Sequence, residues 1–219
     1  MRAAVIIFPG SNCDRDMLSA LHLAGHEAVP IWHKETELPK NIDLIAIPGG
    51  FSFGDYLRCG AIAAKSPIFR EISRHIERGG YALGICNGFQ ILTEAGILPG
   101  ILQKNIGTKF ISKIVDLRVI NTTSTFTHKY MTNNKISIPI AHHEGNYFAS
   151  KNDLEELEDK NCIAFKYKDN PNGASENIAG ILSENHRVLG MMPHPERHIE
   201  DAHGCKDGYP FFEGLFQTS

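Results

Sequence analysis

The sequence predicts an α/β fold, in which helices flank an open and mostly parallel β-sheet and antiparallel strands are added by the second half of the chain. Short apolar runs alternate with segments of helical spacing in the first half of the chain. Glycine-bearing turns follow three of these runs, at residues 9–12, 48–51 and 84–88. Short runs with partial two-residue alternation then dominate the second half, which is typical of hairpins.

The elements of the first half alternate in type. The expected strands are Ala3–Phe8, Glu27–Trp32, Asp43–Ile47 and Tyr81–Ile85. The expected helices are Asp14–Ala24, Ile68–Arg78 and one that begins over Phe89–Glu94. Each helix carries its apolar residues on one face, and glycine follows the first two. Because right-handed crossovers join such strands, we expect them to run parallel.

The second half is expected to add antiparallel strands. They are Phe110–Ile120, Lys135–Ile140, Cys162–Tyr167, Ile178–Leu182 and Arg187–Met191. The polar stretch 121–135 predicts a loop, and the charged stretch Lys151–Lys160 a helix or a surface loop. Tyr209–Phe216 predicts a terminal helix. Since no linker, repeat or low-complexity tract interrupts the chain, residues 1–219 are expected to form a single domain.

Composition excludes several classes of function. The 219 residues carry 25 acidic and 22 basic side chains, a net charge of -3, so neither nucleic acid nor a membrane surface is expected as a partner. No apolar run approaches the roughly 20 residues that span a bilayer. The five cysteines form no CxxC pair, which disfavours a disulfide framework or a zinc ribbon and fits a reducing cytoplasm.

We expect no metal site in this chain. The set of residues that could be considered as metal ligands lies in the second half of the sequence. The spacing of His198 and His203 fits no standard pair of metal ligands on a helix. The members of this set are His142, His143, His198, His203 and Cys205.

The stretch Gly84-Ile85-Cys86-Asn87-Gly88 is the first candidate for chemistry. It lies between a predicted strand and a predicted helix, as in a nucleophile elbow, where glycines permit a tight and strained turn. A helix N-terminus favours the thiolate form of a cysteine placed there, and the N–H of Asn87 could face an oxyanion. The pentapeptide alone equally fits a buried structural cysteine.

A thiol nucleophile needs a base and a group that orients the base. His194 and Glu196 follow the last predicted strand and are separated by Pro195. Prolines on both sides of His194 favour extended backbone, in which residues i and i+2 point the same way. The alternative is an exposed His/Glu pair in a proline-rich turn. We also expect Gly50 or Phe51, after another strand, to offer an oxyanion N–H.

Five ordered motifs, spread over nearly the whole chain, resemble one family. They are FPGSNCDRD (8–16), PGGFSFGDYLRCGAIA (48–63), GICNGFQILTEAGILPG (84–100), IPIAHHEGNY (138–147) and GMMPHPER (190–197). They resemble the class I (triad) glutamine amidotransferases, and most closely the family of stand-alone glutaminase subunits of phosphoribosylformylglycinamidine synthase. The resemblance implies a flavodoxin-like sheet with added antiparallel strands. One departure is Cys59, where that family is expected to have alanine.

The resemblance also implies roles for particular residues. Cys86 would be the nucleophile, His194 the base and Glu196 its orienter, with oxyanion N–H groups from Gly50 and Asn87. Gln90, Glu144 and Gly145 would form the pocket for L-glutamine.

The implied activity is hydrolysis of glutamine to glutamate and ammonia, in de novo purine biosynthesis. Ammonia would pass to a large synthetase subunit that makes formylglycinamidine ribonucleotide, and a small third subunit is expected in the complex. ATP and Mg would bind to the synthetase, since this chain has no GxxxxGK[ST] loop and needs no cofactor of its own. The segment Phe51–Arg58 is expected to couple the two subunits.

Two other functions remain open. A related cysteine hydrolase of the same fold could act alone, as an amidase or a peptidase. A regulatory subunit could carry a silent site, although the intact set of Cys86, His194 and Glu196 disfavours that reading.

Overall fold

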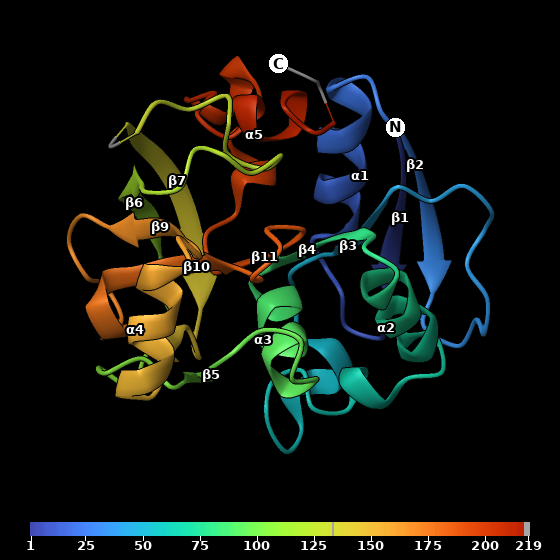
Figure 1. Cartoon of the computed structure of the whole chain (residues 1–219), viewed down its shortest axis with the longest axis horizontal. Coiled ribbons are helices and arrows are strands. Elements are labelled where there is room, and N and C mark those ends of the chain that lie inside the picture. The colour runs from blue at the N-terminus through green and yellow to red at the C-terminus, as the bar shows by residue number, and fades with distance from the viewer. Residues whose placement is uncertain (133, 217–219) are drawn as a thin grey trace.

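A computed structural model describes residues 1–132 and 134–216. Its centre is a nine-stranded sheet (Figure 1). In spatial order the strands are β2 (Glu27–Trp32), β1 (Arg2–Ile7), β3 (Leu44–Ile47), β4 (Tyr81–Ile85), β11 (Val188–Met191), β10 (Ile178–Leu182), β9 (Ile163–Tyr167), β6 (Ile111–Val119) and β7 (Lys135–His142).

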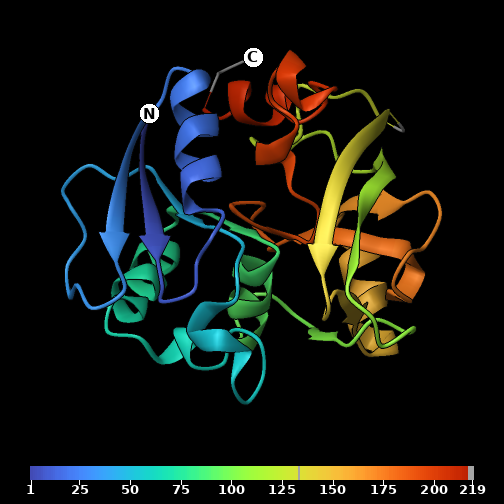
Figure 2. The ribbon, with the colours of Figure 1, turned by 180° about the vertical axis from the view of Figure 1, so that it is seen from behind.

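The half of the sheet from β2 to β11 is parallel. Helix α1 (Asp14–Leu23) covers one face of this half, and α2 (Phe69–Glu77) and α3 (Asn87–Glu94) cover the other (Figures 1 and 2). Strands covered on both faces should be apolar throughout, and all four residues of β3 are indeed buried. The predicted α/β fold is confirmed. The expectation that Arg187–Met191 is one of the added antiparallel strands is wrong on one side, because β11 pairs in parallel with β4 and is antiparallel only to β10.

From β11 to β7 every pair of neighbouring strands is antiparallel. After four reversals β7 points the same way as β11, so both strands end at the same edge of the sheet. A small second sheet pairs β5 (Ile101–Gln103) with β8 (Asn146–Phe148). Figure 2 shows β7 and β6 on the side of the molecule opposite β1 and β2.

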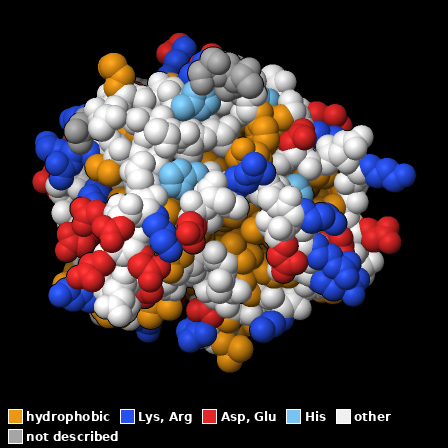
Figure 3. Space-filling view, viewed as in Figure 1, with side chains coloured by type: hydrophobic (Ala, Val, Ile, Leu, Met, Phe, Trp, Pro, Cys, Tyr) orange, Lys and Arg blue, Asp and Glu red, His pale blue; other side chains and the backbone are white. Residues whose placement is uncertain are grey.

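Shorter helices complete the chain. They are α4 (Lys151–Asp159), α5 (Tyr209–Glu213) and the 3-10 turns η1 (Ser52–Asp55), η2 (Ala63–Lys65), η3 (Ser175–Asn177), η4 (Pro195–Arg197) and η5 (Asp201–His203). Helix α4 begins with a capping box, in which Ser150 and Asp153 satisfy each other's backbone N–H groups. Acidic side chains gather over α4 at the left of Figure 3.

The predicted elements agree with these bounds apart from a few differences. Helix α3 already begins at Asn87, β6 excludes Phe110, β7 extends to His142 and α5 ends at Glu213. Strands β5 and β8 have three residues each, too few for a pattern to predict. The predicted loop 121–135 holds no helix or strand over residues 121–132, and residue 133 lies outside the described part.

The site described below lies above the buried core. The parallel strands and the inner faces of α1, α2 and α3 form one apolar cluster, in which Ala3–Ile6 of β1 and Leu44–Ile47 of β3 are 0% exposed. Across the part of the chain that the structure describes, no helix is long and apolar enough to cross a membrane.

Candidate active site

The turns after β1, β3, β4 and β11 meet at one edge of the sheet, where ligands bind in open parallel sheets. Two of these turns are joined directly. The N–H of Cys13 donates to the carbonyl of Gly49 (3.3 Å), and the N–H of Phe51 donates to the carbonyl of Gly10 (3.0 Å). The turns at 9–12 and 48–51 therefore form one wall of the candidate site.

Cys86 occupies the elbow between β4 and α3. Its backbone is in a strained conformation, with φ +52° and ψ -104°, and the residue is 5% exposed. The glycines on either side lie where a side chain has no room. A Cβ on Gly88 would come within 2.0 Å of the Ile47 carbonyl oxygen, and a Cβ on Gly84 within 2.6 Å of the Gly88 carbonyl oxygen. The helix N-terminus can therefore sit directly on the sheet edge.

His194 and Glu196 form a buried pair. Nδ1 of His194 donates to Oε1 of Glu196 over 2.6 Å, and each residue is 1% exposed. The N–H of His194 is held by the Pro139 carbonyl of β7 (2.8 Å). The expected extended backbone is wrong here, because Pro195 opens the 3-10 turn η4, a position that suits its fixed φ. The two side chains meet across that turn instead.

Charge on the His194 ring is favoured by its neighbours. Burial lowers the pKa of His194, but the Glu196 carboxylate and the Cys86 and Cys13 thiols raise it, and the pKa lies well above its ordinary value. No hydrogen bond reaches the buried Nε2 atom from any described residue. This nitrogen is the atom free to exchange a proton with a thiol or a substrate.

Cys13, which the sequence marks only as a loop residue, lies in the same cluster. Its sulfur, a His194 nitrogen and a Glu196 oxygen all lie within 4.8 Å of one another. Nη2 of Arg197 contacts the same sulfur at 3.0 Å. A Cβ on Gly49 would meet His194 Cε1 at 2.7 Å and the Cys13 sulfur at 3.0 Å, so glycine at this position lets the groups converge.

The expectation that this chain holds no metal stays a prediction. Among the residues described, Cys13, His194 and Glu196 are the one set of three potential ligands close enough to share an ion. Within this set, Nδ1 of His194 and Oε1 of Glu196 are already hydrogen-bonded to each other. The late set of His142, His143, His198, His203 and Cys205 forms no such group within the same part of the chain.

Two backbone N–H groups are available for an oxyanion. Asn87 is the first residue of α3, and its N–H has no acceptor within the helix. The N–H of Gly50 also has no acceptor among the described residues, whereas the N–H of Phe51 is taken by Gly10. Of the expected pair Gly50 or Phe51, the geometry therefore favours Gly50.

A cavity of about 90 Å³ opens on one side of Cys86. Gln90 and Glu144 line it, together with Phe51, Asp55 and His142. Gln90 also braces the wall, since its Nε2 donates to the Glu144 carbonyl (2.6 Å) and its Oε1 accepts from Asn87 (2.8 Å).

Gly145 lies just beyond this lining. Both of its backbone groups are held, the N–H by Asn105 (3.1 Å) and the carbonyl by Asn172 (2.7 Å). Gly145 is therefore placed to shape the pocket wall and not to donate to a substrate.

A second cavity, of about 170 Å³, reaches Cys86 from the side of His194. Asn12, Cys13 and Arg197 line it. Phe51 and Phe110 also line it, and both of these side chains are partly exposed to solvent. Cys86 is thus accessible from two sides, one rich in carboxylates and one occupied by the imidazole.

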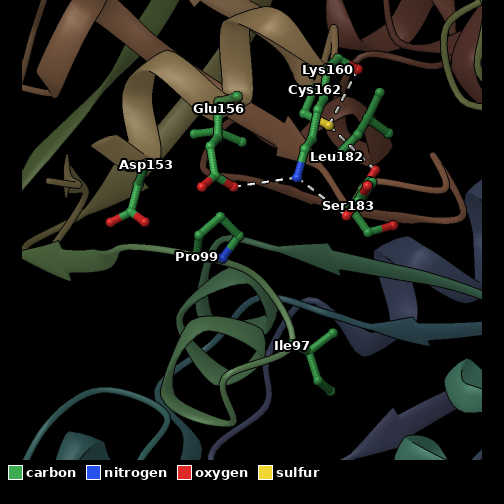
Figure 4. Close-up of a pocket in the computed structure, with 10 residues that line it drawn as sticks. Ile97, Pro99, Asp153, Glu156, Lys160, Cys162, Leu182 and Ser183 are labelled. Carbon is green, nitrogen blue, oxygen red and sulfur yellow. Dashed lines mark hydrogen bonds and ion pairs between the residues drawn. The ribbon is translucent and has the colours of Figure 1, made fainter. Parts of the chain in front are cut away.

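A third pocket, of about 220 Å³, lies between α4 and β10, away from the triad (Figure 4). Its lysine, Lys160, is already paired with Glu156 (3.3 Å) and Glu184 (3.4 Å). Cys162 points its sulfur at the carbonyls of Lys160 and Ser183, as Figure 4 shows. With its polar groups satisfied, this pocket carries no chemistry that we can assign.

Comparison with known proteins gives consistent matches. A family model described as a CobB/CobQ-like glutamine amidotransferase domain matches residues 1–205. A protein of Ruegeria sp. (strain TM1040), named phosphoribosylformylglycinamidine synthase subunit PurQ, is 57% identical over 215 residues, covering 98% of this chain and 97% of the relative. The protein of the same name from Zymomonas mobilis subsp. mobilis is 55% identical and covers 100% of this chain and 99% of its own.

One solved structure is also close. A chain of the structure titled PurLQS from Thermotoga maritima superposes with a TM-score of 0.91 at 43% identity, covering 98% of this chain and 96% of that one. Sequence and fold therefore agree over nearly the full length of the relatives.

Proposed function

Because the chain belongs to the family of CobB/CobQ-like glutamine amidotransferases, and within it to the phosphoribosylformylglycinamidine synthase subunits named PurQ, we propose that it is the glutaminase subunit of that synthase. It hydrolyses L-glutamine and supplies ammonia for the conversion of formylglycinamide ribonucleotide to formylglycinamidine ribonucleotide in purine biosynthesis. The observation that carries the chemistry is the strained Cys86 elbow beside the buried His194–Glu196 pair.

The proposed reaction begins from the ion pair in which Nε2 of His194 already holds the proton of the Cys86 thiol. The thiolate attacks the carboxamide carbon of glutamine, and the N–H groups of Gly50 and Asn87 stabilise the oxyanion that forms. The imidazolium returns the proton to the departing nitrogen, so that ammonia leaves and a γ-glutamyl thioester remains on Cys86. Water then loses a proton to His194, attacks the thioester and releases glutamate and the thiol. Glu196 holds the tautomer of the ring throughout.

The size of the pocket supports a small substrate. The cavity beside Cys86, of about 90 Å³, is small and enclosed by the walls described above, which favours a small substrate over a polypeptide. The complete set of Cys86, His194 and Glu196 argues against a silent regulatory chain.

Ammonia is useful only if a partner consumes it before it becomes ammonium. We assign that step to the large synthetase subunit, with ATP and Mg bound there and a small third subunit in the complex. Exposed Tyr56 and Leu57, the latter 89% exposed, support the proposal that the Phe51–Arg58 segment contacts the synthetase. Residues 1–219 would act as one glutamine amidotransferase domain, which is consistent with the continuous nine-stranded sheet from β2 to β7.

The test is glutamate release from glutamine by the purified chain, alone and with the synthetase subunit, ATP and formylglycinamide ribonucleotide. We expect low activity alone and a large increase in the complex, and no activity for Cys86→Ser in either state. High activity that the partner leaves unchanged would indicate an independent amidase. Absence of activity in both states would indicate a regulatory chain.

A further inference from the structure

The cavity beside Cys86 has a wall whose chemistry the hydrolytic steps do not use. At this wall Asp55, Cys59 and Glu144 come together. Burial raises the pKa of the Cys59 thiol, and its contacts with Glu144 and Asp55 raise it further. Cys59 therefore stays protonated between two carboxylates.

Asp55 is held there by an unusual backbone. Phe53, Asp55 and Leu57 all have positive φ, between +54° and +70°, within one short loop. Such strain persists where the surrounding structure imposes it, and it is concentrated at functional sites. The Oδ1 atom of Asp55 is buried and has no hydrogen-bond partner among the described residues. A buried carboxylate oxygen without a hydrogen-bond partner destabilises the folded protein unless a ligand donates a hydrogen bond to it.

His142 adds a second unpartnered acceptor to the same cavity. It is 2% exposed, and its Nδ1 is hydrogen-bonded to Oδ1 of Asn105 (3.0 Å). Burial and the charge of His194 lower the pKa of His142 to about 4, so the ring is neutral near pH 7. The proton lies on Nδ1, because Asn105 Oδ1 can only accept. Nε2 is therefore a bare acceptor, and it too has no partner in the described chain.

Among the residues that the structure describes, no lysine or arginine lines this cavity. The nearest basic residue of the loop, Arg58, is turned away and paired with Glu94 (2.6 Å). The wall thus offers two carboxylates and a neutral imidazole acceptor, with no cation to balance them. Of the groups on free glutamine, the α-ammonium is the one whose charge is opposite to that of this wall.

We propose that Asp55 is a specificity-determining residue that binds the α-ammonium group of the substrate while the carboxamide reaches Cys86. The inference rests on the proposed glutaminase function and adds the residue that selects a free α-amino acid. Glu144 lies on the other side of Cys59, and its carboxylate adds to the negative charge of the wall. Analogues without the amino group would leave the Asp55 carboxylate unpaired in the occupied pocket, and should therefore be rejected.

The kinetic test compares Asp55→Asn with the wild type, both assembled with the synthetase subunit. The substrates are L-glutamine and glutaramate, which lacks only the α-amino group. We expect kcat/KM for glutamine to fall about 10²-fold, mainly through KM, and kcat/KM for glutaramate to change little. Asp55→Glu should recover part of the preference for glutamine, and the exposed Asp159→Asn should match the wild type.

A labelling test separates this inference from the glutaminase proposal. Cys86 is alkylated either by 6-diazo-5-oxo-L-norleucine, which carries the amino acid group of glutamine, or by iodoacetamide, which does not. Asp55→Asn should slow the first reaction about 10²-fold and leave the second unchanged. Equal slowing of both reactions, or of neither, would overturn the role of Asp55. The labelling rates decide this even if the wild type releases no glutamate, a result that would count against the proposed function alone.

Discussion

Cys86 and Cys13 both lie against His194, so either thiol could in principle use it as a base. Both also precede a helix, since Cys13 caps α1 and Cys86 precedes α3. What separates them is access. Cys86 lines both cavities, whereas Cys13 lines only the one without the carboxylate wall. Under the proposed mechanism the nucleophile must reach a substrate bound by that wall, and we therefore propose Cys86 for this role.

We therefore expect Cys86→Ala to lower glutamate release at least about 10³-fold, as removal of a nucleophile does in other triads. Cys13→Ala should lower it less than about tenfold, because only a neighbour of the base is lost. Glutamate release in the assembled complex measures both effects, and mass spectrometry locates the alkylated cysteine. A larger loss for Cys13→Ala than for Cys86→Ala would reverse the assignment.

The grouping of Cys86, His194 and Glu196 could be predicted from the sequence because these residues lie in local motifs. The elbow is a pentapeptide, and His194 and Glu196 are two residues apart. Cys13 could not be found this way, since it reaches His194 only after the turns following β1 and β3 have joined. The local backbone of the His194–Glu196 pair was also mispredicted. Prolines on both sides fit either an extended chain or the start of a turn, and the sequence does not decide between them.

At the element scale, the close packing of helix α3 against the sheet depends on glycine. Gly88 lies on the helix face that approaches β3, and its α-carbon is so close that a Cβ would overlap the Ile47 carbonyl oxygen at 2.0 Å. The obstacle is backbone in the buried sheet, which cannot move aside as a flexible side chain could. Any side chain at this position must push α3 away from the sheet, and with it the turn that carries Cys86.

We expect Gly88→Ala to reduce the free energy of unfolding by about 1–3 kcal/mol, the usual cost of overpacking a core. Glutamate release should fall as well, because the elbow moves with the helix. Urea denaturation measures the first effect. The matched control is Gly107→Ala, since a Cβ there has no atom within 4 Å. Equal stability of the two variants would mean that α3 does not rest on β3 as described.

Strands and helices with a clear local sequence pattern could be predicted. Features that depend on contacts between distant segments could not. The strands of the parallel half are short apolar runs between clear turn signals, and their predicted bounds hold within one or two residues. The order of the antiparallel strands, with β9 between β10 and β6, depends on pairing between distant segments and leaves no local pattern. The resemblance to a known family pointed to Glu144 as a residue near the pocket, and Glu144 lines the cavity. It did not point to Asp55, whose position depends on a strained backbone.

At the scale of the whole molecule, two buried histidines make stability depend on pH in opposite senses. The pKa of His194 is raised on folding, so the stability that it contributes is present below about pH 6.5 and is lost as pH rises through its folded value. The pKa of His142 is lowered to about 4 by burial and by the charge of His194. The unfolded chain therefore binds a proton that the folded chain does not, and stability falls as pH drops from about 6.5 toward 4.

Linkage sets the size of the His142 effect. A folded pKa of about 4 against an unfolded value of about 6.5 corresponds to a loss of about 2 kcal/mol between pH 7.5 and pH 5. Because the His194 effect is present in both proteins, urea denaturation at these two pH values should show that the wild type loses about 2 kcal/mol more stability than His142→Gln, which has no proton to gain. His22→Gln, which alters an exposed position on α1, should follow the wild type. If His142→Gln lost as much stability on acidification as the wild type, His142 would have to be protonated in the folded protein. Its Nε2 could then not serve as an acceptor for the substrate, and the wall opposite Cys86 would rely on Asp55 and Glu144 alone.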